Sequence, residues 1–265
     1  MNVQCSTALA ALLSMAPAAH AITASDPPHE SRQAATATAD ADIARIESLG
    51  RSLFEHDLAA ERATDALVAK GMRKDDRVAG WVTEQRDNRY VVSILGGDSS
   101  VLYRVVTDDK GTLAGPVQTL SPPEPLSPYE AGAAAARALA LSSKFQACSK
   151  NYNTVVLPNV DGTANAWSVY LLPGTFDPAA VPLGGSHRVE IADEKITSSR
   201  PYTLSCITLQ RPPQKGAMMV THLLDPTPTE VHVYWSLWAR APLFVSTAKD
   251  VIWKIENGHI SKVVD

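Results

Sequence analysis

Between residues 78 and 120 the sequence repeats one short pattern four times. Stretches with alternating apolar and polar residues lie at 78–84, 90–95, 100–106 and 112–120, and turn-forming residues separate them. Alternation with a period of two predicts strands, and loops this short connect only adjacent antiparallel strands. This region therefore predicts an antiparallel β-meander, which restricts the fold to classes that contain such a sheet.

The segment 38–72, before the meander, has helical periodicity instead. Apolar residues recur there at spacings of three and four, at Ile43, Ile46, Leu49, Leu53 or Phe54, and Leu58. This spacing places them in one stripe on a helix. Gly50 falls inside the stripe, and it predicts a kink or a division of the helix. A helix followed by a meander can cover one face of the sheet and leave the other face in water.

A proline-rich segment, 120–129, follows the meander and shows no regular pattern, as in a linker between domains or a stiff crossover within one domain. We place a boundary near residue 125. Ser127 and Glu130 then have the spacing of a capping box, which predicts a helix that continues to about Ser142. Further strands are predicted at 153–158, 166–172, 187–192, 203–209, 217–224, 230–238, 243–247, 251–255 and 259–264. The prediction is an α+β protein with two helix-plus-antiparallel-sheet modules, 38–125 and 126–265.

The first 21 residues have the pattern of a cleavable signal peptide. An apolar run at 8–16 has the length of a signal core, and Ala19 and Ala21 supply the small residues that a signal peptidase accepts. The segment before the run lacks Lys and Arg, which departs from the usual pattern, and a cut after Ala18 also fits the small-residue rule. The alternative is a short buried helix. Residues 22–37 are polar, contain two prolines and predict a disordered leader.

The cysteines agree with export to the periplasm or the medium. Cys5 is lost with the signal peptide, and Cys148 and Cys206 remain as a pair. An even pair in an oxidising compartment predicts a disulfide, worth roughly 4 kcal/mol for a loop of this length. The competing interpretation is a catalytic thiol, which would need an unpaired cysteine and a base beside it.

The charge excludes some kinds of partner. The chain has 24 Lys and Arg against 28 Asp and Glu, a formal net charge of −4. A surface for nucleic acid or an anionic membrane needs clustered basic residues, so neither partner is expected. No apolar run after the signal peptide approaches the ~20 residues of a membrane span. We expect a soluble mature protein without a transmembrane segment.

His222 and His232 are the best candidates for a chemical site. They lie in the predicted strands 217–224 and 230–238, which flank a turn with two prolines. If Leu224 pairs with Glu230, antiparallel counting places the two histidines opposite each other, with Cβ atoms ~5 Å apart. Such a pair can share a transition metal, with Asp225 or Glu230 as a third ligand. The alternative is a half-exposed sheet face without a ligand, and a register slip of one residue would separate the histidines.

Other motifs predict turns. Gly97-Asp98-Ser99 resembles the surroundings of a nucleophilic serine, but it lies between two strands and no helix follows it. The oxygen-rich loop 159–165 lacks the acidic spacing of an EF-hand. Alternation places His187 and Glu190 on opposite faces of their strand.

Three segments carry a resemblance to a known group of proteins. Residues 153–158 (NTVVLP), 220–233 (VTHLLDPTPTEVHV) and 242–245 (PLFV) resemble exported proteobacterial proteins of unknown function, over about residues 75 to 265. The resemblance implies export and a shared fold, and no activity. We favour a non-catalytic binding or inhibitory protein of the bacterial envelope, which needs no cofactor and whose partner is an envelope or extracellular protein. The alternative is a metal-dependent or hydrolytic enzyme that uses His222 and His232.

Overall fold

The computed structural model describes residues 29–72, 75–159, 165–213 and 216–263. The predicted signal peptide, 1–21, lies outside these ranges, as do residues 22–28 of the predicted leader. The chain divides into two compact units, 1–40 and 41–265. The sheets, the cores and the cavities described below all belong to the second unit.

Helix α1, His29–Ala69, begins earlier than predicted. It includes residues 29–37 of the segment predicted as a disordered leader, and the residues that follow the prolines there are rich in alanine, the best helix former. The predicted stripe is confirmed, since Leu53 is fully buried and Ile43, Ile46 and Leu49 pack on the same core. The helix is continuous through Gly50, where the backbone passes close to Val233. A Cβ atom there would lie 2.4 Å from Cβ of Val233.

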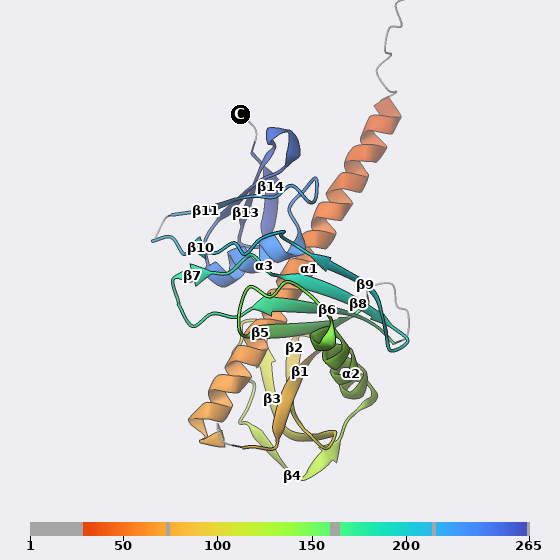
Figure 1. The fold of residues 1–265 in the computed structure, drawn as a ribbon, viewed down its shortest axis with the longest axis vertical. Helices are drawn as coiled ribbons and strands as arrows, with labels where there is room; N and C mark the ends of the chain where they lie inside the picture. The colour runs from red at the N-terminus through yellow and green to blue at the C-terminus, as the bar shows by residue number, and fades with distance from the viewer. Residues whose placement is uncertain (1–28, 73–74, 160–164, 214–215, 264–265) are drawn as a thin grey trace, which may run out of the picture. The chain divides into compact units, whose positions relative to one another are not determined.

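The meander is confirmed as a four-stranded antiparallel sheet in the order β1-β2-β3-β4 (Figure 1). Its strands are β1 Val78–Arg86, β2 Arg89–Gly96, β3 Ser100–Asp108 and β4 Gln118–Pro125. The last strand was predicted at 112–120, but it lies mostly in the segment expected to be irregular. Because β4 is at the edge of the sheet, its prolines do not interrupt an interior ladder of hydrogen bonds.

A second antiparallel sheet has the order β5-β6-β8-β9. Its strands are β5 Tyr152–Pro158, β6 Ala166–Pro173, β8 His187–Ala192 and β9 Lys195–Pro201. The first three were predicted. The exposed edge strand β9 was missed because it lacks apolar alternation. The predicted strand 203–209 is not formed, apart from its last residue, which belongs to the short pair β7 Ala180–Val181 and β10 Leu209–Gln210.

Helix α2, Pro128–Ser142, connects the β1-β2-β3-β4 sheet to the β5-β6-β8-β9 sheet. The predicted capping box is confirmed, because Ser127 Oγ accepts from the Glu130 amide at 3.2 Å and Glu130 Oε2 accepts from the Ser127 amide at 2.7 Å. Ala133 and Ala136 on its buried face share one core with Val82 of β1 and Trp167 of β6. The boundary predicted near residue 125 therefore falls inside a unit whose core is continuous.

The third sheet contains one parallel pair. Its order is β11-β12-β13-β14, with strands Met218–Thr221, Leu243–Ser246, Ile252–Glu256 and His259–Lys262, and a 3-10 turn at Ala248–Asp250. The pair β11–β12 is parallel and the other pairs are antiparallel. The predicted final hairpin is confirmed, and Asn257 and Gly258 both have positive φ, as a type I′ turn requires.

The predicted strand 230–238 is wrong. These residues form helix α3, Glu230–Ala239, which packs on β12 and β13. The helix supplies the crossover that a parallel pair needs. Val231, Val233, Tyr234 and Trp235 are all buried, so the helix is covered nearly all round. A segment buried on every side shows no clear helical periodicity, and the alternation in its sequence was accidental.

The disulfide between Cys148 and Cys206 is confirmed, and it links positions 58 residues apart in sequence. It ties the segment before β5 to the segment after β9. The α+β class is confirmed together with this bond. No helix in the part of the chain that the structure describes is long and apolar enough to span a membrane.

Candidate functional site

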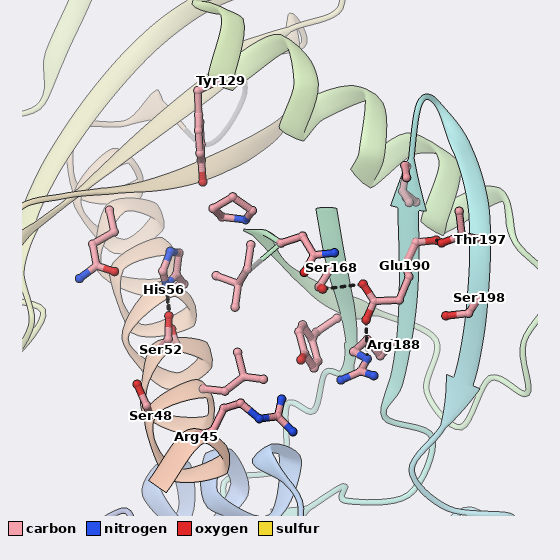
Figure 2. A pocket seen from close by; sticks show the side chains of 18 residues that line it. Arg45, Ser48, Ser52, His56, Tyr129, Ser168, Arg188, Glu190, Thr197 and Ser198 are labelled. Carbon is pink, nitrogen blue, oxygen red and sulfur yellow. Dashed lines mark hydrogen bonds and ion pairs between the residues drawn. The ribbon is translucent and has the colours of Figure 1, made fainter. Parts of the chain in front are cut away.

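A cleft of about 750 Å3 lies between α1 and one face of the β5-β6-β8-β9 sheet (Figure 2). Helix α1 contributes Arg45, Ser48, Ser52 and His56. Side chains three or four residues apart share one face of a helix, so a single face of α1 forms this wall. Ser168 of β6 and residues of β8 and β9 form the opposite wall. The cleft therefore joins residues that are far apart in sequence.

Strand β8 positions the central charged pair of the cleft. Its odd-numbered residues, beginning with His187, are buried, and alternation turns Arg188 and Glu190 to the other face. Nε of Arg188 lies 2.8 Å from Glu190 Oε1, but its N–H is not aligned with that oxygen, so the contact is an ion pair only. Glu190 Oε2 accepts a hydrogen bond from Ser168 Oγ at 2.6 Å. The Glu190 carboxylate is thus satisfied within the wall.

A buried carboxylate of α3 lies behind this wall. Oε1 of Glu230 accepts from Arg188 Nη1 at 3.0 Å and from the Tyr170 hydroxyl at 3.1 Å. The Tyr202 hydroxyl donates to the same oxygen. Burial raises the pKa of both tyrosines, so they remain neutral donors at physiological pH. Burial disfavours the charge of Arg188, but the tyrosines and Glu230 around it raise its pKa above the ordinary value.

The α1 wall contains one arginine, Arg45, without a hydrogen-bond or ion-pair partner among the described residues. Its side chain is exposed. Figure 2 shows its guanidinium extended from α1 towards the sheet. Arg45 and Arg188 are the cations of the lining and Glu190 is its carboxylate, so the lining has a net positive charge when His56 is neutral.

His56 does not activate the serine next to it. Burial lowers its pKa to about 4, so the ring is neutral at physiological pH. Its Nδ1 lies 2.7 Å from the Ser52 carbonyl oxygen, which can only accept, so Nδ1 carries the proton. The Ser52 hydroxyl lies 3.4 Å from this nitrogen and meets no basic lone pair there. This pair therefore lacks the geometry of a serine nucleophile and its base.

Hydroxyl groups provide most of the remaining polar lining. They come from Ser48, Ser52, Ser168, Tyr129, Tyr170, Thr197 and Ser198. Those of Ser168, Tyr129, Tyr170 and Thr197 donate to acceptors within the protein. Hydroxyl groups donate and accept hydrogen bonds without carrying charge. A positive lining rich in hydroxyls suits a small ligand that has an anionic group and several hydroxyl groups of its own.

The structure brings His222 and His232 together, although the predicted strand pairing is absent. Their ring centroids are 4.6 Å apart in an edge-to-face arrangement. His222 follows β11 and His232 lies in the first turn of α3, so the crossover juxtaposes them. Among the described residues, no group of three or more His, Cys, Asp or Glu side chains could hold a metal ion.

Hydrogen bonds define the state of both histidines. His222 Nε2 lies 2.8 Å from Asp225 Oδ2, which also accepts from Arg200 Nη2 at 2.7 Å. The Thr229 amide donates to His232 Nδ1 at 3.1 Å, so the proton of His232 is on Nε2. That Nε2 has no hydrogen-bond partner among the described residues, and burial lowers the pKa of His232 to about 3. Metal binding through Nε2 would require the opposite tautomer of His232, which the Thr229 amide disfavours.

The other predicted motifs are turns where the structure describes them. Gly97 to Ser99 connects β2 and β3, and Ser99 has a φ of 62°. The hairpin around the oxygen-rich loop is confirmed by the pairing of β5 and β6, while residues 160–164 of the loop lie outside the described residues. His187 contacts Ser199 on the face of β8 opposite to Glu190, as alternation predicted.

Sequence reasoning missed the cleft. The alternation that excluded a His187–Glu190 site also places Arg188 and Glu190 together, and the helical spacing of Arg45, Ser52 and His56 gives them a common face. Neither pattern shows that these two faces meet. Comparison of the chain with family models, with curated proteins and with solved structures finds no match.

Proposed function

We propose that this chain is an exported, non-catalytic binding protein of the bacterial envelope, periplasmic or secreted, and that its cleft binds a small anionic ligand with several hydroxyl groups. Arg45 carries the proposal, because it reaches towards the sheet without a partner among the described residues. An arginine that no protein group neutralises can form charge-assisted hydrogen bonds with a carboxylate or a phosphate. The disulfide is compatible with export.

The opposite wall supports the same ligand class. Arg188 is held by Glu230 and Glu190, so its guanidinium has a fixed orientation next to Ser168. A fixed guanidinium on one wall and a free one on the other can hold two ends of a ligand. The hydroxyl groups between them match a sugar or a hydroxy acid. An envelope or extracellular protein that displays such a group is the corresponding macromolecular partner.

Calorimetric titration tests the proposal with glucose 6-phosphate, gluconate, inorganic phosphate and glucose as probes. We expect a charged, hydroxylated probe to bind, and Arg45→Gln to weaken that binding about tenfold. The control, Arg89→Gln, removes the same charge from the exposed first residue of β2 and should leave the affinity unchanged. Equal affinity of the wild type and Arg45→Gln for the probe would contradict binding of the ligand in this cleft. Mass spectrometry of the exported protein should find Ile22 as its first residue.

The second candidate function is a metal-dependent or hydrolytic enzyme that uses His222 and His232. The 4.6 Å separation of their rings favours it, whereas the hydrogen bond to His232 Nδ1 opposes it. Elemental analysis of protein purified without a histidine tag separates the two functions. A stoichiometric transition metal that disappears in the His222→Ala/His232→Ala double variant would support the enzyme and contradict our proposal.

A further inference from the structure

A second cavity, of about 500 Å3, lies between α1, the end of β6 and α3. It shares no lining residue with the first cleft. Its lining includes carboxylates from α1 and aromatic rings from several elements. Its lining residues, all of them described, include no Lys, Arg or His. The cavity therefore differs in charge from the cleft that we assign to an anion.

The carboxylates belong to one face of α1. Asp57, Glu61 and Asp65 follow each other at intervals of four residues. Asp57 is buried, and it accepts hydrogen bonds from the Tyr234 hydroxyl at 2.7 Å and from Asn153 Nδ2 at 3.0 Å. Glu61 and Asp65 are exposed. Both exposed carboxylates lie 3.5 Å from Arg62 Nη1, which is not part of the lining. The lining itself therefore contains three carboxylates and no cation.

The aromatic residues form the rest of the wall. Trp81, Tyr234, Trp235, Trp238 and Phe176 all line the cavity. Trp235 and Trp238 pack edge to face, with ring centroids 5.3 Å apart. Phe176 is 94 % exposed, so water surrounds a large apolar ring at this site. An exposed ring beside an aromatic cavity is well placed to cover a ligand.

Two of these rings already bind cations within the protein. The guanidinium carbon of Arg137 lies 5.5 Å from the Trp81 ring centroid, and that of Arg211 lies 4.7 Å from the Trp238 ring centroid. Each guanidinium occupies one face of its ring. The electron-rich faces of tryptophan attract cations in general, and this attraction increases where water is excluded.

We propose that this cavity binds a small organic cation of the quaternary ammonium class, held by the aromatic rings and balanced by Asp57 and Glu61. A quaternary ammonium group has no N–H to donate, so rings and nearby carboxylates are the groups that can recognise it. Burial raises the pKa of Asp57 to about 6, with a further increase from Glu61 and opposing hydrogen bonds from Tyr234 and Asn153. A bound cation would stabilise the ionised form of this carboxylate.

Choline and tetramethylammonium are suitable probes, and 3,3-dimethyl-1-butanol is the neutral counterpart of choline. Titration of the full exported chain, followed by calorimetry and tryptophan fluorescence, should show binding of both cations. We expect the neutral analogue to bind at least about tenfold more weakly, because it lacks the charge that rings and carboxylates recognise.

Two variants at the mouth of the cavity test the assignment without disturbing the core. Glu61→Gln removes a charge and Phe176→Ala removes an exposed ring, and each should weaken choline binding about three- to fivefold. Glu194→Gln, in the exposed turn between β8 and β9, removes the same charge far from this lining and should leave binding unchanged.

Three results would overturn the proposal: neither cation binds with a dissociation constant below about 10 mM, the neutral analogue binds equally well, or Glu61→Gln and Glu194→Gln behave alike. The test is independent of the first cleft. Arg45→Gln should keep full choline binding, so failure of one site is distinguishable from failure of the other.

Discussion

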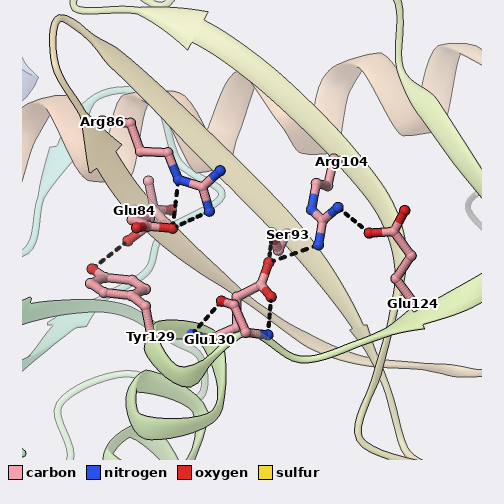
Figure 3. A network of polar contacts seen from close by, with 9 residues as sticks. Glu84, Arg86, Ser93, Arg104, Glu124, Tyr129 and Glu130 are labelled. Atoms are coloured by element: carbon pink, nitrogen blue, oxygen red, sulfur yellow. Dashed lines mark hydrogen bonds and ion pairs between the residues drawn. The ribbon is translucent and has the colours of Figure 1, made fainter.

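Helices α2 and α3 both place a buried glutamate in their first turn, against an arginine of a neighbouring sheet, but they do so differently. At α2 a single residue, Glu130, both caps the helix and binds the arginine (Figure 3). Glu130 accepts from the Ser127 amide, from Ser93 Oγ at 2.6 Å and from Arg104 Nη2 at 3.3 Å. The same side chain thus caps the helix and neutralises the arginine.

At α3 two residues divide these roles. His232 accepts from the Thr229 amide and so satisfies the start of the helix. Glu230 is left to bind Tyr170, Tyr202 and Arg188. Its oxygen Oε1 therefore serves three donors from β6, β8 and the segment after β9.

The two arginines, Arg104 next to α2 and Arg188 next to α3, differ in whether they line a cleft. Each has a second carboxylate, Glu124 for Arg104 and Glu190 for Arg188. Arg104 lines neither of the cavities described above. Arg188 lines the cleft between α1 and the β5-β6-β8-β9 sheet and is oriented by Glu230 behind it. The start of α2 stabilises the junction between two sheets, whereas the start of α3 also holds a guanidinium where a ligand can reach it.

The largest effect should come from removing the two glutamates in turn. Glu230→Ala leaves two buried tyrosine hydroxyls and Arg188 without their shared acceptor, and we expect the free energy of unfolding to fall by about 3 to 5 kcal/mol. Glu130→Ala should cost less, about 2 to 3 kcal/mol, because it leaves one buried hydroxyl, that of Ser93, without its acceptor instead of two. Both arginines keep a second carboxylate in these variants, Arg104 that of Glu124 and Arg188 that of Glu190. Urea denaturation measures both.

Glu124→Ala is the control for this comparison. Its side chain is 49 % exposed, and exposed ion pairs contribute at most about 1 kcal/mol. If Glu130→Ala destabilised the protein as much as Glu230→Ala, the two helix starts would be equivalent and the division of roles at α3 would have no energetic meaning.

The same contrast explains which helix could be predicted from the sequence. Ser127 and Glu130 form the usual capping pattern, and the helix that they predict is confirmed. At α3 the residue in the equivalent position is His232, which is not a recognised capping residue, and the apolar residues around it alternate as in a strand. Local patterns therefore predicted α2 and failed at α3, where tertiary burial determines the structure.

The sites were less predictable than the elements. The disulfide followed from counting, since Cys148 and Cys206 had only each other after loss of the predicted signal peptide. The meeting of His222 and His232 was predicted from a strand pairing that does not exist. The cleft depends on how α1 packs against β8, and no pattern within either segment contains that information. Residues that contact each other over such a separation become visible only in the fold.

A smaller effect is expected from acid. Burial alone would raise the pKa of Glu130, but hydrogen bonds from Ser93 and Ser127 and the charge of Arg104 outweigh it, so the pKa lies below its ordinary value of 4.5. A depressed pKa contributes stability above the ordinary value, and this contribution is lost as the pH falls through the folded-state pKa. In Glu130→Gln the free energy of unfolding should therefore decrease less steeply below pH 4.5 than in wild type.

Urea denaturation at a series of acidic pH values measures this slope. Glu194→Gln removes one exposed carboxylate and serves as the control for the change in net charge. Identical acid profiles for wild type and Glu130→Gln would show that the hydrogen bonds at the start of α2 do not favour the ionised form.

The smallest effect should come from Arg45. Because this side chain is exposed and has no partner among the described residues, Arg45→Gln should change the free energy of unfolding by no more than about 0.5 kcal/mol. Arg188→Gln is the matched comparison, since it removes the cation between two carboxylates and should cost several times more. A loss above about 1 kcal/mol in Arg45→Gln would give Arg45 a structural role. In that case weaker anion binding by the variant would no longer identify a direct contact between Arg45 and the ligand. The arginines of both walls would then be fixed by contacts within the protein.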